Sequence, residues 1–146
     1  MLVPGDVAPE FEAPTSGGGR LRLSELRGRS VVLFFYPKAG TLGCTAEAKG
    51  FAHEFPDFHA RGVELVGISV DSASEQTAFA SECSLPFPLV SDADKEIARR
   101  FGVLGAFGHA KRVTFLIGPD GRIREIVDSM LPRPHVDRAR RAFLEG

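Results

Sequence analysis

Cysteine is scarce in this sequence, and an excess of charge of either sign is missing. The 146 residues include two cysteines, Cys44 and Cys83, and carry a formal net charge of −1. A charge this close to zero gives no general attraction to nucleic acid or to an anionic membrane. In a cytosolic protein, two cysteines are more often redox-active or free than structural. We therefore expect neither nucleic acid nor a membrane as a partner, and we examine both thiols as reactive groups.

Long apolar runs and targeting signals are missing too. No run approaches the roughly 20 apolar residues of a membrane span. Residues 1–6 lack the charged-then-apolar pattern of a secretory signal. The hydrophobic content of 43% is ordinary for a globular protein, and a chain of this length can bury its own core. We expect one cytoplasmic domain spanning residues 1–146.

Motifs for metals and nucleotides are also lacking. No two of the histidines His53, His59, His109 and His135 are four residues apart, and none stands at ligand spacing to a cysteine. The three glycines at 17–19 are not followed by Lys-Ser/Thr, which favours a flexible turn over a phosphate cradle. No Cys-x-x-Cys pair is present, which argues against a thiol–disulfide oxidoreductase. We expect no metal and no cofactor.

One stretch of the sequence organises the rest. Val31–Tyr36 consists of six consecutive β-branched, aromatic or other apolar residues, which predicts a buried strand. Pro37 ends this strand because proline has no N–H to donate to the sheet. Helical spacing begins at Cys44, and three phenylalanines then fall on one helix face: Phe51, Phe55 and Phe58.

This placement gives Cys44 a possible chemical role. Unpaired backbone N–H groups and the helix dipole favour an anion in the first turn of a helix, and a thiolate is an anion. Cysteines in such positions can have a pKa between roughly 3.5 and 7.5, so they are nucleophilic at neutral pH. The alternative is an inert buried cysteine, because free cysteine is among the most buried residue types.

The remaining patterns predict an α/β domain with a mixed sheet. An N-terminal β-hairpin is expected from residues 9–13 and 20–23. Further strands are expected at 63–70, 87–90, 112–117 and 123–127, and further helices at 72–83, 92–100 and 133–144. The resulting order is β-β-β-α-β-α-β-α-β-β-α. In the last helix we expect Val136, Ala139 and Phe143 to face inward.

The residues around Cys44 resemble a known family. Pro37-x-x-x-Thr41-x-x-Cys44 is similar to the P-x-x-x-T-x-x-C signature of peroxiredoxins, and the wider run resembles their Q-type, or bacterioferritin-comigratory, branch. The resemblance resumes in three later blocks, at 67–71, 85–92 and 112–117. It implies a thioredoxin-like fold of the peroxiredoxin type, with a central mixed sheet flanked by helices.

The resemblance also implies a thiol-dependent peroxidase that reduces hydrogen peroxide and organic hydroperoxides through a sulfenic acid on Cys44. Thr41 and the Cys44 backbone N–H are then expected to hold the peroxide. Arg112 is expected to stabilise the thiolate and the transition state, and Pro37 to shield the thiolate from water. Glu47 is expected to orient Arg112, although a glutamate is common in the first turn of any helix.

The sequence departs from the branch pattern after Cys44. Many Q-type members carry a second cysteine five residues later, where this chain has Lys49, and Leu42 stands where proline is usual. Cys83 is the remaining thiol, and by resemblance we expect it to resolve Cys44 through an intramolecular disulfide that thioredoxin or another small dithiol reduces. The branch is often monomeric, and we expect a monomer.

Two other interpretations stay open at this point. The protein could be a one-Cys peroxidase in which Cys83 packs beside Phe79, four residues earlier on the same helix. It could also be a non-catalytic binding module or chaperone on the same fold, which would tolerate replacement of Cys44.

Overall fold

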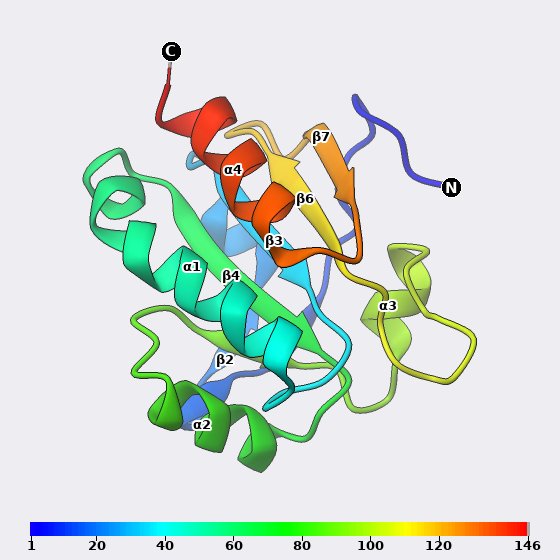
Figure 1. Ribbon diagram of the computed structural model, residues 1–146. Coiled ribbons are helices and arrows are strands. Elements are labelled where there is room, and N and C mark those ends of the chain that lie inside the picture. The colour runs from blue at the N-terminus through cyan, green and yellow to red at the C-terminus, as the bar shows by residue number, and fades with distance from the viewer. Residues whose placement is uncertain (146) are drawn as a thin grey trace.

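A five-stranded mixed sheet forms the centre of the protein (Figure 1). The computed structural model describes residues 1–145. The strands are β3 (Val31–Phe35), β4 (Glu64–Ser69), β5 (Leu89–Ser91), β6 (Val113–Ile117) and β7 (Ile123–Asp128). They lie in the order β5-β4-β3-β6-β7. Strands β3, β4 and β5 are parallel, whereas β6 and β7 run antiparallel to their neighbours. The strand that precedes Cys44 therefore lies in the middle of the sheet.

Within residues 1–145, four α-helices and a short hairpin complete the fold. The helices are α1 (Leu42–Ala60), α2 (Ala73–Glu82), α3 (Glu96–Arg100) and α4 (Pro132–Phe143). The N-terminal hairpin pairs β1 (Glu12–Pro14) with β2 (Arg20–Arg22), and 3-10 turns follow each of its strands. The observed order of helices and strands confirms the order expected from the sequence, although β1 and β2 are shorter than expected.

The alternation of side chains along β3 divides the core into two clusters. Val31, Leu33 and Phe35 pack with the N-terminal segment and α3. The intervening residues Val32, Phe34 and Tyr36 pack with α1 and α4, which lie side by side in Figure 1. Because successive side chains of a strand point to opposite faces, β3 is buried on both faces and forms a fixed base for the loop that follows it.

Helix boundaries follow from local capping. The Ser72 side chain accepts from the Glu75 N–H and the Glu75 side chain accepts from the Ser72 N–H, and this capping box begins α2. Helix α3 begins at Glu96, later than expected, because the Asp92 carboxylate caps it from outside by accepting the N–H groups of Ile97 and Ala98. Within residues 1–145, no helix combines the length and the hydrophobicity that crossing a membrane requires.

Candidate active site

Cys44 lies at the junction between the central strand and α1. It is the third residue of the helix, and Thr41 is the residue that precedes the helix. The Cys44 residue is 1% exposed and belongs to the core cluster between the sheet and α1. The N–H groups of the first turn of α1 have no partners within the helix, so this position favours negative charge.

Arg112 lies directly against the Cys44 thiol. Strand β6 runs antiparallel to β3 with Val113 opposite Phe35, so Arg112, one residue before β6, falls beside the end of β3 from which the Cys44 loop leaves. Its Nη2 donates to the Cys44 Sγ at 3.6 Å, and its Nε donates to the Met130 carbonyl oxygen at 3.0 Å. The guanidinium is therefore held on two sides while it faces the sulfur.

Glu47 provides the third contact of this guanidinium. Arg112 Nη1 donates to Glu47 Oε1 at 2.6 Å, and the two side chains are 10% and 0% exposed. Burial raises the pKa of Glu47 to about 7, although the charge and hydrogen bond of Arg112 act in the opposite direction. The pair is thus almost completely desolvated, and its geometry fixes the direction in which Arg112 points.

Gly43 allows the guanidinium to approach. A Cβ atom at this position would lie 2.8 Å from Arg112 Nη2 and 3.6 Å from its Cζ. Contacts between carbon and nitrogen this short are repulsive, so any larger residue would push Arg112 away from Cys44. The packing requirement at Gly43 depends on a residue 69 positions later in the chain, so the residues next to it do not reveal it.

Thr41 and Pro37 flank the same region. The Thr41 hydroxyl is exposed and donates to the Lys38 carbonyl oxygen at 2.9 Å, which leaves its lone pairs free to accept. Pro37 and Arg112 together line a groove of about 430 Å³ that also contains Lys111, Asp128, Ser129 and Met130. This groove provides space for a small molecule next to the guanidinium.

The loop between β3 and α1 is tied to the end of β4. The Asp71 carboxylate accepts from the Ala39 N–H at 2.8 Å and from the Ser69 hydroxyl at 2.6 Å through the same oxygen. Asp71 is buried, so these bonds are shielded from water. Asp71 thereby restrains the chain that connects Pro37 with Thr41.

Cys83 is close to the same core cluster but is not bonded to Cys44. Both cysteines have free thiols in this structure. Cys83 ends α2, its N–H donates to the Phe79 carbonyl oxygen, and its side chain is partly buried against the cluster that contains Cys44. The next residue, Ser84, adopts a φ of 51°, in the left-handed region.

His135 was missed by the sequence analysis. We expected Val136, Ala139 and Phe143 to face inward; His135 and Ala139 are completely buried, whereas Val136 and Phe143 are only partly buried. The spacing contained the signal, because His135, Ala139 and Phe143 recur every four residues and so share one helix face. The imidazole lies behind Glu47, with Nδ1 3.7 Å from Glu47 Oε2.

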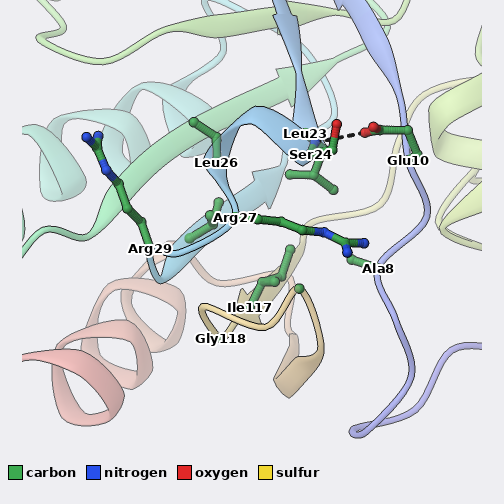
Figure 2. Close-up of a pocket in the computed structure, with 11 residues that line it drawn as sticks. Ala8, Glu10, Leu23, Ser24, Leu26, Arg27, Arg29, Ile117 and Gly118 are labelled. Atoms are coloured by element: carbon green, nitrogen blue, oxygen red, sulfur yellow. Dashed lines mark hydrogen bonds between the residues drawn. The ribbon is translucent and has the colours of Figure 1, made fainter.

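No group of three or more His, Cys, Asp or Glu side chains within residues 1–145 is arranged to hold a metal ion. A cavity of about 20 Å³ is lined by Leu23, Arg27, Val31, Gly118 and other residues (Figure 2). Val31 begins β3, whereas Cys44 follows the end of that strand, so this cavity is separate from the cysteine site.

A family match, related sequences and solved structures all place this chain among the same proteins. Residues 4–126 match the AhpC/TSA family. The chain is 35% identical over 143 residues to peroxiredoxin Bcp of Escherichia coli strain K12, covering 93% of this chain and 92% of that protein.

Two solved structures have the same fold. Peroxidoxin BcpB from Mycobacterium tuberculosis superposes with a TM-score of 0.89 at 38% identity, covering 95% of this chain and 94% of the other. The bacterioferritin comigratory protein of Xanthomonas campestris, described for its alkyl peroxide reduction activity, gives a TM-score of 0.86 at 30% identity, with 92% and 90% covered. The mixed sheet with its flanking helices is therefore the thioredoxin-like fold expected from the resemblance.

Proposed function

Because the chain belongs to the AhpC/TSA family of peroxiredoxins, which are thiol-dependent peroxidases, we propose that Cys44 is its peroxidatic residue. One observation carries this assignment most directly. Arg112 points a guanidinium N–H at the Cys44 sulfur from 3.6 Å, inside a site where the cysteine is 1% exposed. A cation fixed beside a buried sulfur can stabilise the negative charge that moves through the site when the sulfur reacts.

The proposed reaction is a two-electron oxidation of this sulfur. The thiolate attacks the terminal oxygen of a hydroperoxide, an S–O bond forms and the O–O bond breaks. Sulfur becomes a sulfenic acid, and the alkoxide or hydroxide that leaves takes up a proton to give an alcohol or water. Negative charge moves from sulfur to the leaving oxygen, so hydrogen-bond donors that are already in place lower the barrier.

The surrounding residues match these requirements. Arg112 can stabilise both the thiolate and the developing negative charge, because its other N–H groups are already held by Glu47 and Met130. In our proposal, the Thr41 hydroxyl accepts a hydrogen bond from the peroxide and the Cys44 N–H donates to it. Pro37 shields the sulfur from water, and the groove between Pro37 and Met130 accommodates the organic part of a hydroperoxide.

Cys83 is proposed as the resolving residue. Its thiolate would attack the Cys44 sulfenic acid and form a disulfide as the S–O bond breaks, and the hydroxide that leaves takes up a proton to give water. A disulfide requires Cα atoms within roughly 7 Å, and the two cysteines belong to the ends of separate helices. In our proposal, the first turn of α1 and the end of α2 rearrange to bring them together. The left-handed backbone of Ser84 supports this proposal, because a serine in that conformation adds local strain at the end of α2.

A dithiol reductant would then restore both thiols by exchange. We propose thioredoxin or a small protein of the same chemistry for this step, with hydrogen peroxide and organic hydroperoxides as substrates. A cytoplasmic location, a monomeric state and a single domain over residues 1–146 stay predictions from the sequence.

Stopped-flow measurement of peroxide consumption tests the assignment of Cys44. The reduced wild type is compared with Cys44→Ser and Cys83→Ser. We expect wild type and Cys83→Ser to react rapidly for one turnover, and Cys44→Ser to lose the rapid phase. A wild type no faster than free cysteine would overturn the peroxidase proposal and favour a binding module.

Mass spectrometry after one equivalent of peroxide tests the role of Cys83. A loss of about 2 Da from the reduced protein supports the Cys44–Cys83 disulfide. A stable gain of about 16 Da instead indicates a one-Cys enzyme in which Cys83 is only a packing residue. Cys83→Ser is the matched control, because it should form the heavier product in either case.

A further inference from the structure

The buried histidine behind the site has two well-defined hydrogen bonds. His135 Nε2 lies 2.8 Å from the Ser129 carbonyl oxygen, and Nδ1 lies 2.7 Å from the Thr114 hydroxyl. A carbonyl oxygen only accepts, so Nε2 carries a hydrogen, and in a neutral ring Nδ1 then accepts from the Thr114 hydroxyl. His135 therefore connects three elements: α4, on which it lies, β6 through Thr114, and the segment after β7 through Ser129.

The residue bonded by His135 is next in the chain to the residue bonded by Arg112. Ser129 is followed by Met130, whose carbonyl oxygen accepts from Arg112 Nε at 3.0 Å. The segment between β7 and α4 is short, since β7 ends at Asp128 and α4 begins at Pro132. Releasing the Ser129 carbonyl would let this segment move, and the acceptor for Arg112 would move with it.

The second connection is electrostatic. Glu47 Oε2 is buried without a hydrogen-bond partner among the described residues, and His135 Nδ1 lies 3.7 Å away. Burial lowers the pKa of His135, the charge of Arg112 lowers it further, and the Ser129 hydrogen bond and Asp128 act in the opposite direction. An uncharged ring leaves Glu47 with one cationic partner, Arg112, whereas an imidazolium would compete for the carboxylate.

We propose that His135 is a positioning residue for Arg112, acting through the Ser129–Met130 backbone and by bordering Glu47 as a neutral ring. This inference rests on the proposed function of Cys44, because it concerns how the guanidinium is held against that thiol. His135 touches neither the sulfur nor the peroxide, so it does not take part in the chemical step itself.

A comparison of two reactions of the same thiol tests the proposal. Peroxide reduction needs Arg112 in place to stabilise the leaving oxygen, whereas alkylation by iodoacetamide needs only the thiolate. We expect His135→Asn, which loses the donor to Ser129, to lower the ratio of peroxide rate to alkylation rate by about tenfold. His135→Gln places an amide N–H near the position of Nε2 and should restore most of the ratio.

The double variant with Arg112→Met decides whether His135 acts through Arg112. We expect His135→Asn to cost less than about twofold when Arg112 is already methionine, because the two effects are coupled. An equal loss in both backgrounds would overturn the proposal, and so would an unchanged ratio in the His135→Asn single variant. If His135→Asn does not fold, Thr114→Val is used in its place, since it removes one hydrogen bond of the ring.

His53→Asn is the matched control, since His53 is exposed on α1 and the same substitution there should leave the ratio unchanged.

The experiment distinguishes an error about His135 from an error about the proposed function of Cys44. If wild type itself does not outpace free cysteine, Cys44 is not peroxidatic. If wild type is fast and His135→Asn equals it, only the role of His135 is wrong.

Discussion

Arg112 passes over Gly43 so closely that a Cβ atom on the glycine would lie 2.8 Å from Nη2. The same nitrogen donates to the Cys44 sulfur. A side chain at position 43 therefore cannot be added without moving the group that faces the thiol.

Gly43→Ala should separate activity from stability. Alanine is favoured over glycine in a helix by up to about 1 kcal/mol, so the free energy of unfolding should not fall. The rate of peroxide consumption should fall about tenfold because the guanidinium is displaced. Urea unfolding and stopped-flow kinetics on the same sample provide the two measurements. In the Arg112→Met background, Gly43→Ala should have no further effect on the rate; a further tenfold loss there contradicts this explanation.

Arg112→Lys should be almost as damaging as Arg112→Met. Lysine keeps the positive charge, but it cannot donate at the same time to Cys44, Glu47 and Met130 in the planar geometry of a guanidinium. We expect both variants to lose about 100-fold in the rate of peroxide reduction. Arg124→Met, at an exposed arginine of β7, is the control. A rate for Arg112→Met within about twofold of wild type would show that the assigned role is wrong.

Glu47 should make stability depend on pH in a defined direction. Its pKa is raised from 4.5 to about 7, so the folded protein keeps a proton that the unfolded chain has already lost between these values. The contribution to stability is therefore fully present below about pH 4.5 and disappears as the pH rises through about 7. From about pH 5 to about pH 8, wild type should lose about 2 to 3 kcal/mol relative to Glu47→Gln.

His135 acts in the opposite direction, because its pKa is lowered and its contribution disappears as the pH falls below 6.5. Both proteins in the comparison contain His135, so its burial contributes to both stability curves and the difference between wild type and Glu47→Gln reports mainly on the carboxyl group. Urea unfolding at the two pH values provides the data. Parallel stability curves for the two proteins would refute the shifted titration of Glu47.

Asp71→Ala should loosen the loop that carries Thr41. The carboxylate accepts hydrogen bonds from the Ala39 N–H and the Ser69 hydroxyl, and bonds to a charged acceptor contribute about 1.5 to 3 kcal/mol. We expect the free energy of unfolding to fall by about 2 to 3 kcal/mol and the peroxide rate to fall with it. Asp57→Ala, at an exposed position of α1, should change stability by less than about 0.5 kcal/mol. Equal stability of the two variants would mean that Asp71 does not anchor the loop.

Much of the fold follows from local patterns. The apolar run from Val31 to Tyr36 predicted the central strand, and its alternation divides the core into two clusters. The Ser72 capping box marked the start of α2. These features depend on residues within one or two turns of each other, so the local sequence is sufficient to predict them. The position of Cys44 after the central strand is determined in the same local way.

The arrangement of the site depends on contacts between distant segments. Arg112 reaches Cys44 because β6 pairs with β3 in one particular register, and the sequence motif gives no distance for that contact. Gly43 is restricted by Arg112, and His135 lies behind Glu47 because α4 packs against α1. Neither contact can be recognised from the residues next to Gly43 or His135 in the sequence.

The sequence by itself thus determined the order of helices and strands, the position of Cys44 at the start of α1 and the family signature, because local periodicity and capping act over a few residues. Only the tertiary structure decided which groups surround the thiol and how they are held. Hydrogen bonds such as those from Arg112 to Glu47 and Met130 depend on the packing of α1, α4 and the sheet, and on the exclusion of water from between them.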